Sequence, residues 1–213
     1  MTAVSTDRAR HWDAVYQAKA PTAVSWYRPH LAQSLACIRA CPAGRDARVI
    51  DVGGGASTLV DDLLDDGFRY VTVLDVSEEA LRQARARLGP RAARAQWIAG
   101  DVTHTPLPER AYDVWHDRAV FHFLAGPDDR QRYREQLHHA VRPGGQAVIA
   151  TFALDGPPRC SGLDVVRYSP ATLRRALGAA LKLVASAEEL HQTPSGATQA
   201  FLYCRFQLQA STR

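Results

Sequence analysis

Two stretches, VIDVGGGAS (Val49–Ser57) and VLDVS (Val73–Ser77), decide the fold of this chain. The first is an apolar strand that leads from Asp51 into a glycine turn, and the second is an apolar strand that ends on Asp75. This order of strand, glycine turn, strand and acid is typical of a nucleotide-binding crevice at the carboxyl edge of a parallel sheet. There, an acid at the end of the second strand can bind both hydroxyls of a ribose.

The glycine turn also indicates which nucleotide is bound. Three consecutive glycines, Gly53, Gly54 and Gly55, let the backbone approach a ligand closely and allow positive φ. The dinucleotide pattern G-x-G-x-x-G, read from Gly53, reaches Thr58 where its last glycine belongs. Asp51 would repel a diphosphate but suits a cation. Both departures disfavour an NAD-dependent oxidoreductase and favour S-adenosylmethionine, whose sulfonium and amino groups are positive and which has no phosphate.

Composition places the chain among ordinary globular proteins. With 213 residues, 46% hydrophobic and 23% charged, one α/β domain is expected. The net charge of +4 does not indicate nucleic-acid binding, because the densest basic run, Arg82 to Arg94, has the spacing of a solvated helix face. The N-terminus is polar and no window approaches a membrane span. Four scattered cysteines indicate reduced thiols and a cytoplasmic protein.

Strands and helices are expected to alternate after residue 45. The expected strands are Arg48–Val52, Tyr70–Asp75, Ala95–Ala99, Tyr112–His116, Gln146–Phe152, Lys182–Ser186 and Gln199–Phe206. Helices are expected at about Ser57–Leu64, Glu78–Leu88 and Pro127–Val141, and a further helix is expected after its cap residue Ser169. Pro143-Gly144-Gly145 is expected to break the chain before the fifth strand. The prediction is a Rossmann-like, doubly wound α/β fold. Its seven-stranded sheet has helices on both faces and an antiparallel last strand.

The ordered set VIDVGGGAS, VLDVS, AGDVT, YDVWHDRAVFHFL and RPGGQAVIATF resembles the class I S-adenosylmethionine-dependent methyltransferases over essentially the whole chain. Trp12-x-x-x-Tyr16 and the SWY element resemble the branch with protein-lysine methyltransferases. Trp115–Ala119 resembles that branch and the thiopurine and tellurite-resistance enzymes. The resemblance implies an enzyme with one domain over residues 1–213: an N-terminal helical lid (1–45), a cofactor-binding core (46–155) and a C-terminal helix and hairpin (156–213).

Carried over residue by residue, the resemblance implies a set of cofactor contacts. Asp51 would hold the amino group, Asp75 the ribose diol, and Asp101 with the Val102 amide the adenine amino group. Trp26 and Tyr27 would cover the sulfonium as part of the lid, or else fill the core; Arg28 could pair with the cofactor carboxylate. The predicted cofactor-binding residues are Trp26, Tyr27, Asp51, Gly53, Gly54, Gly55, Ser57, Asp75, Val76, Asp101, Val102 and His116.

The fourth strand supplies the candidate catalytic residues, His116, Asp117 and His122. A histidine near neutral pKa can take a proton from an acceptor, although His116 could also simply bond the sheet edge. Asp117 could orient His116 or pair with Arg118. No metal site is predicted. A soft metalloid held by Cys160, His122 and His191, the last expected in the hairpin loop, is a less favoured alternative.

The predicted function is methyl transfer from S-adenosylmethionine to a small nucleophilic acceptor, with thiols and chalcogen compounds as candidates. The alternative is a protein-lysine N-methyltransferase, which should show an acidic, open acceptor channel. A binding module without catalysis is less favoured, because Asp75 and the glycines are present. The expected partner is therefore a small molecule or a protein lysine, with no nucleic acid and no membrane.

Overall fold

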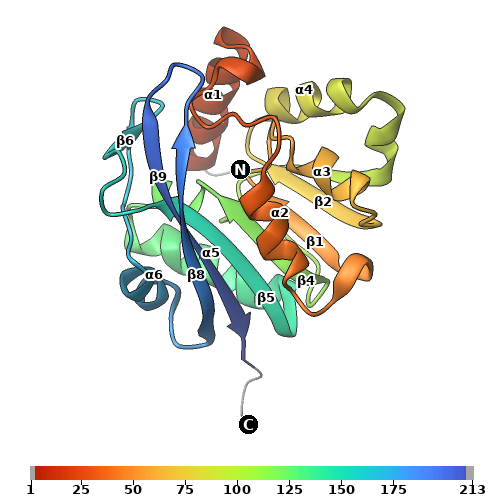
Figure 1. Ribbon diagram of the computed structural model, residues 1–213, viewed down its shortest axis with the longest axis vertical. Coiled ribbons are helices and arrows are strands. Elements are labelled where there is room, and N and C mark those ends of the chain that lie inside the picture. Colours follow the sequence, from red (N-terminus) through yellow and green to blue (C-terminus); the bar gives the residue numbers. More distant parts are fainter. Residues whose placement is uncertain (1–2, 210–213) are drawn as a thin grey trace.

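The computed structural model describes residues 3–209, in which one seven-stranded sheet runs in the order β3-β2-β1-β4-β5-β9-β8 (Figure 1). Its strands are β1 (Arg48–Val52), β2 (Tyr70–Asp75), β3 (Ala95–Ala99), β4 (Tyr112–Arg118), β5 (Val141–Phe152), β8 (Leu181–Gln192) and β9 (Thr198–Leu208). The strands β1 to β5 are parallel to one another, and β9 is antiparallel to both β5 and β8. The predicted fold, with its antiparallel last strand, is confirmed.

Helices cover both faces of this sheet because side chains alternate between faces along each strand. Val49 and Val73 pack with one set of helices, whereas Ile50 and Leu74 pack with the other. One face carries α2 (Ala32–Arg39), α3 (Leu59–Asp65) and α4 (Glu78–Leu88); the other carries α5 (Pro127–Ala140) and α6 (Pro170–Leu177). The order of β1 between β2 and β4 places the switch point of the sheet, where such folds bind ligands, at the carboxyl end of β1.

The first helix, α1 (Ala3–Ala18), lies beside α4 at the top of Figure 1. Asp13 Oδ1 accepts hydrogen bonds from Ser77 Oγ (2.6 Å) and from the backbone N–H of Glu79 (3.2 Å) at the start of α4. A carboxylate is favourable at this position because the helix dipole is positive there. Gln83 adds a bond to the carbonyl of Tyr16 (2.8 Å), so α1 is anchored along its second half.

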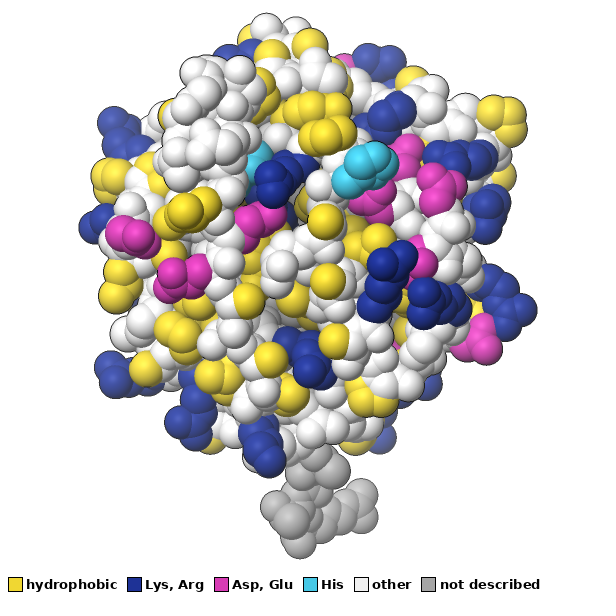
Figure 2. Space-filling model, viewed as in Figure 1, with side chains coloured by type: hydrophobic (Ala, Val, Ile, Leu, Met, Phe, Trp, Pro, Cys, Tyr) yellow, Lys and Arg dark blue, Asp and Glu magenta, His cyan; other side chains and the backbone are white. Residues whose placement is uncertain are grey.

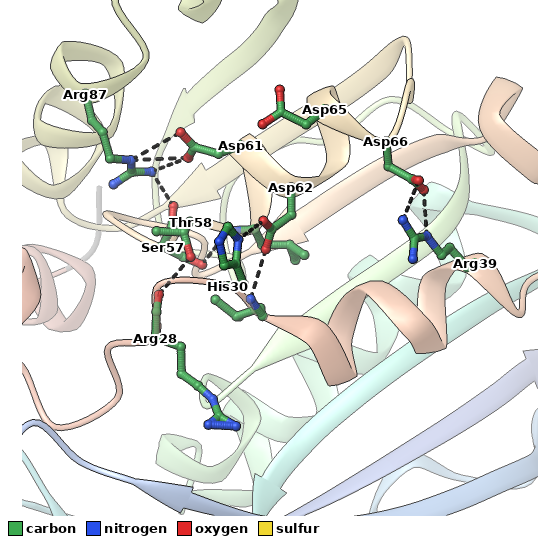
Figure 3. A network of polar contacts seen from close by, with 12 residues as sticks. Arg28, His30, Arg39, Ser57, Thr58, Asp61, Asp62, Asp65, Asp66 and Arg87 are labelled. Carbon is green, nitrogen blue, oxygen red and sulfur yellow. Dashed lines mark hydrogen bonds and ion pairs between the residues drawn. The ribbon is translucent and has the colours of Figure 1, made fainter.

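The segment between α1 and α2 contains the short helix η1 (Pro21–Ala23) and is tied to α3, as Figure 3 shows. Asp62 accepts from His30 Nδ1 (2.7 Å) and from the backbone N–H of Leu31 (2.9 Å). Thr58 Oγ1 donates to the carbonyl of Arg28 (2.9 Å). These bonds hold the segment over the glycine turn that precedes α3.

Two local expectations were wrong, and one small element was not predicted. Pro143-Gly144-Gly145 does not break the chain, because β5 already begins at Val141 and passes through it, with a register shift opposite β4 and φ +81° at Gly144. His191 lies within β8 rather than in the hairpin loop, since β8 is longer than expected. The middle of β8 is exposed at the edge of the sheet and carries polar residues, so the sequence shows no alternation of apolar residues there that would predict a strand. A small ladder of β6 (Arg159–Cys160) and β7 (Leu163–Asp164) was not predicted.

None of the helices in the described part of the chain combines the length and hydrophobicity that a membrane span requires.

Candidate functional site

The glycine turn after β1 has a conformation that only glycine adopts without strain. Gly53 has φ +68° and Gly55 has φ +42°. A Cβ on Gly53 would collide with the side chain of Val120, and one on Gly55 would lie 2.7 Å from Asp75 Oδ2. The turn therefore brings bare backbone between the ends of β2 and β4, and side chains there would close the space above the sheet.

Two neighbouring cavities, one larger than the other, lie above this edge of the sheet. Predicted residues line the larger one: Trp26, Gly53, Asp75, Val76, Asp101 and Val102. The smaller one is also lined by predicted residues: Trp26, Tyr27, Asp51, Gly53, Gly54, Ser57 and His116. Tyr16, Trp26, Gly53 and Arg118 line both cavities, which makes them neighbouring parts of one site.

Asp75 ends β2 in the larger cavity, and its side chain is nearly out of contact with solvent. Its Oδ1 accepts the backbone N–H of Ser77 (2.8 Å). Burial raises the pKa of Asp75 to about 7, with the charge of Asp51 adding to the effect. A buried carboxylate with few donors gains stability when a ligand brings hydroxyl groups, so Asp75 fits the ribose of a nucleoside.

Asp101 follows β3 and is held by donors on both sides. Thr103 donates from its backbone N–H (2.9 Å) and from Oγ1 (2.7 Å), and Arg8 donates from Nη1 (3.0 Å). Burial works to raise the pKa of Asp101, but the Thr103 bonds and the Arg8 charge outweigh it and lower that pKa. Arg8 also pairs with Asp129. Its guanidinium thus joins α1 to the loop after β3 and to the first turn of α5 at the Asp101 end of the cavity.

Asp51 and His116 form a buried pair between neighbouring strands. His116 Nδ1 donates to Asp51 Oδ1 (2.7 Å), and His116 Nε2 lies 3.0 Å from Ser34 Oγ in α2. His116 is 1% exposed and Asp51 is 3% exposed. Both ring nitrogens therefore have partners, and the ring fixes the carboxylate that faces the glycine turn.

Asp117 lines neither cavity and is bonded to the turn that follows β4. Its oxygens accept the backbone N–H groups of Val120 (2.9 Å) and Phe121 (3.1 Å) and the hydroxyl of Tyr133 (2.6 Å). Burial raises the pKa of Asp117 to about 6. The pairing of Asp117 with Arg118 considered from the sequence is wrong, because these partners occupy the carboxylate. Asp117 holds a turn in which Ala119 has φ +72°.

His122 also lines neither cavity. Its ring lies against the rings of Phe123 and Phe152, and its Nδ1 accepts the backbone N–H of Phe152 (3.3 Å). Burial, followed by the charge of Arg118, lowers the pKa of His122 to about 3. The imidazole is therefore neutral at physiological pH and has no ready proton to give.

The far end of the larger cavity has a different character. Phe152, Cys160 and Phe201 line it, and they come from β5, β6 and β9 in the last third of the chain. Arg118, at the end of β4, lies 4.2 Å above the Phe201 ring. Burial raises the pKa of Cys160, so this thiol is neutral. This end is apolar and aromatic with one cation.

The sequence predicted an N-terminal lid, but it did not identify the residues of α1 that line the site. Arg8, Trp12 and Tyr16 all line the larger cavity. Trp12 and Tyr16 pack edge-on against Trp26, with ring centroids 5.8 and 6.1 Å apart. The four-residue spacing of Arg8, Trp12 and Tyr16 puts them on one helix face, and that spacing was the available signal. Phe123 and Leu124, after β4, were also missed.

The three residues of the metalloid alternative lie in different surroundings. Cys160 lines the larger cavity, His122 is packed between rings, and His191 Nε2 bonds the carbonyl of Ser25 (2.7 Å). Within residues 3–209, no three His, Cys, Asp or Glu side chains gather as metal ligands would.

Comparisons with known proteins agree with this geometry. Residues 49–145 match the family model described as a methyltransferase domain. The eEF1A lysine and N-terminal methyltransferase of Mus musculus is 24% identical over 151 residues, 68% of this chain. The chain spans about a fifth (21%) of that relative's length.

Two solved structures share the fold over nearly the whole chain. One is Burkholderia thailandensis 1,6-didemethyltoxoflavin-N1-methyltransferase with 1,6-didemethyltoxoflavin and S-adenosylhomocysteine bound. It has a TM-score of 0.69 and 22% identity, over 97% of this chain and 88% of that one. The other comes from work on converting a disulfide bond into a thioacetal group during echinomycin biosynthesis. It has a TM-score of 0.77 and 22% identity, over 96% and 94% of the chains.

The family model confirms the predicted resemblance to methyltransferases over residues 49–145, and the solved structures confirm the predicted fold. Residues 49–145 are therefore similar in sequence to the methyltransferase-domain family, and nearly the whole chain shares the fold of solved methyltransferase structures.

Proposed function

We propose that this protein transfers the methyl group of S-adenosylmethionine to a small nucleophilic molecule. One observation carries the proposal: the larger cavity joins the nucleoside-binding ends of β2 and β3 to the apolar end formed by Phe152, Cys160 and Phe201. A cofactor and a small acceptor can therefore lie in line within one cavity. In-line displacement at a methyl group needs mainly alignment and exclusion of water.

The cofactor fits the residues that line the two cavities. We assign Asp75 to the ribose hydroxyls, Asp101 and Val102 to adenine, and Asp51 to the amino group beside Gly53, since all four residues line the cavities. When bound, S-adenosylmethionine supplies an electrophilic methyl group on a sulfonium. This chain's residues bind it, orient it and shield it, and Trp26 offers an aromatic face on which a cation is stabilised by about 1 kcal/mol.

The candidate catalytic residues take different parts in this proposal. His116 bonds Asp51, so we assign it to orienting that carboxylate. Its predicted role as the base that takes the acceptor's proton stays a prediction. Asp117 supports the turn 117–121, which carries Arg118 and Val120 into the site. His122 supports the rings at the apolar end. Roles for Asp117 and His122 in the chemistry also stay predictions.

A protein lysine is the second candidate acceptor, since a relative is a lysine methyltransferase. The charges favour a small molecule. A lysine ammonium needs acidic residues at the acceptor end, but there Arg118 is positive, and Glu189 is paired with Arg28 (2.8 Å). The acidic residues among the described lining of the larger cavity are Asp75 and Asp101, which we assign to the cofactor.

We do not expect nucleic acid as a partner. Arginines of the predicted basic run pair with carboxylates or with an aromatic ring: Arg82 with Glu79, Arg87 with Asp61, Arg91 with Asp65, and Arg85 over Trp97. Figure 2 shows basic and acidic side chains interspersed on one face, with no unbroken basic stripe there. We also propose that the protein works in a reducing compartment such as the cytoplasm, because Cys37, Cys41, Cys160 and Cys204 are free thiols.

A methyl-acceptor screen tests the proposed function. Purified protein and radiolabelled S-adenosylmethionine are incubated with small thiols, with selenite and tellurite, with small carboxylated aromatic thiols and phenols, and with lysine-containing peptides. We expect label in a small molecule and none in the peptides. Label in peptides alone would identify a lysine methyltransferase and overturn the proposed acceptor class.

A further inference from the structure

Arg118 is a cation without an anionic partner. Its Nε donates to Tyr203 Oη (2.9 Å) and its Nη1 to the carbonyl of Trp26 (3.2 Å), while Nη2 is buried and bonds nothing among the described residues. In residues 3–209, no carboxylate lies within ion-pair distance of its guanidinium. An unpaired charge with a buried N–H is costly in a protein interior.

The surroundings keep this cation in place and available. Tyr203 and Phe201 of β9 hold the guanidinium from one side, the latter by its ring face at 4.2 Å. The positive charge reaches the neighbouring groups, because it contributes to lowering the pKa of both His122 and His191. The other cation of this region, Arg28, is already neutralised by Glu189.

We propose that Arg118 binds an anionic group of the methyl acceptor, a carboxylate or a comparable oxyanion. This proposal rests on the proposed function and names its substrate class: a small apolar or aromatic molecule whose nucleophilic atom points toward Gly53 and whose anion lies on Nη2. A guanidinium is suited to this role because its planar N–H fork binds carboxylates with directional, charge-assisted bonds. Phe152 and Phe201 provide the apolar contact for the rest of the molecule.

The cofactor's own carboxylate has the same chemistry, but Arg118 is better placed for the acceptor. Arg118 lines both cavities, but its guanidinium stacks on Phe201 and bonds Tyr203 of β9, beside Phe152 and Cys160 in the larger cavity. We therefore expect the loss of Arg118 to weaken acceptor binding much more than cofactor binding.

Ligand titration of the S-adenosylhomocysteine-loaded protein tests this proposal. Benzoate and phenylacetate are compared with benzamide and phenylacetamide, by ligand-observed NMR or calorimetry. We expect the carboxylates to bind about tenfold more tightly than the amides in the wild type, as one charge-assisted contact predicts. Arg118→Met should abolish that preference, and Arg118→Lys should retain part of it.

The controls separate this proposal from its alternatives. Arg142→Met removes a guanidinium that pairs with Asp113, at the opposite ends of β4 and β5, and should keep the carboxylate preference. Thermal unfolding checks that each variant is folded, and Arg118→Lys serves if Arg118→Met is not. A preference that survives in Arg118→Met, or none in the wild type, overturns the proposal.

Two further arms identify the source of the anion. Methylthioadenosine lacks the carboxylate of S-adenosylhomocysteine. If Arg118→Met strongly lowers the affinity for S-adenosylhomocysteine but not the affinity for methylthioadenosine, then Arg118 binds the cofactor carboxylate. That result would overturn the acceptor assignment. If the wild type binds no S-adenosylhomocysteine at all, the proposed function fails. In that case, the same carboxylate titration of the ligand-free protein still tests Arg118.

Discussion

The cofactor end and the acceptor end of the larger cavity are built in different ways. The cofactor end comes from the carboxyl ends of β1, β2 and β3: Asp75 is the last residue of the buried strand β2, and Asp101 lies two residues after β3. The acceptor end is assembled from Phe152, Cys160 and Phe201, which lie on separate elements up to 49 residues apart in the numbering (152 to 201), together with Arg118. In the proposed site, short local motifs therefore form the cofactor end, whereas the tertiary arrangement forms the acceptor end.

The largest expected effect lies at the cofactor end. Asp75→Asn should weaken S-adenosylhomocysteine binding by about 100-fold, since two hydrogen bonds to a charged acceptor are lost at about 1.5 kcal/mol each. Isothermal titration measures this affinity. Asp164→Asn, an exposed acid beside the acceptor end, is the matched control and should bind like the wild type. Equal affinity in Asp75→Asn would remove Asp75 from the cofactor site.

The glycine turn gives the next effect. Gly53→Ala places a Cβ at φ +68° and against Val120, so we expect about 2 kcal/mol lower stability from backbone strain, with weaker cofactor binding. Gly144→Ala is the control, because it has φ +81° but no atom within 4 Å of its Cβ. Urea denaturation and titration of both variants separate strain from collision. Identical losses of cofactor affinity in the two variants would show that the collision is irrelevant.

Asp117 tests whether a buried acid near the site is structural. Asp117→Asn should lower the free energy of unfolding by about 2 kcal/mol, because three hydrogen bonds converge on this carboxylate. S-adenosylhomocysteine affinity should change little, and Tyr133→Phe should show a smaller stability loss. Chemical denaturation and titration measure both. Full stability with abolished methyl transfer would return Asp117 to a chemical role.

The pKa of Asp75 predicts a pH dependence confined to the cofactor end. Since that pKa is raised to about 7, the ligand-free carboxyl is protonated below this pH, and hydroxyl donors prefer the ionised form. Cofactor affinity should therefore fall as the pH drops from 8 to 6, by up to about tenfold per pH unit below the pKa. Carboxylate ligands at Arg118 should lack this profile over the same range. A flat cofactor profile would contradict the assignment.

The raised pKa of Asp75 also makes the stability of the folded protein depend on pH. The folded protein holds a proton on Asp75 between the ordinary Asp pKa and about 7, while the unfolded chain does not. This group's contribution to stability is thus present at low pH and is lost as the pH rises through 7. Asp75→Asn should remove that slope from the unfolding free energy measured against pH.

The smallest effect is expected in the segment that joins α1 to α2. The hydrogen bond to Asp62 raises the pKa of the exposed His30, so the charged pair is present at low pH and is lost as the pH rises through that raised value. His30→Ala should change the cofactor dissociation rate by less than about threefold, as for an exposed ion pair. Stopped-flow measurements at two pH values give this dissociation rate. A larger change would show that the contact between His30 and Asp62 is important for keeping the site closed.

The contrast between the two ends also explains what could be predicted from sequence. Asp75 and Gly53 could be predicted because a strand, a turn and an acid follow one another in the chain. Arg8 was missed because its role depends on where α1 lies against Asp101, which no local pattern encodes. Arg118 was considered only with its neighbour Asp117, but the strand turns those side chains toward different partners, as alternation along β4 requires.

The central claim is that the cavity above β1 holds S-adenosylmethionine. The most direct measurement is a calorimetric titration of the wild-type protein with S-adenosylhomocysteine and, in parallel, with NADH. The structure predicts micromolar-range binding of one S-adenosylhomocysteine per chain and no binding of NADH. Binding of NADH without binding of S-adenosylhomocysteine would contradict the account.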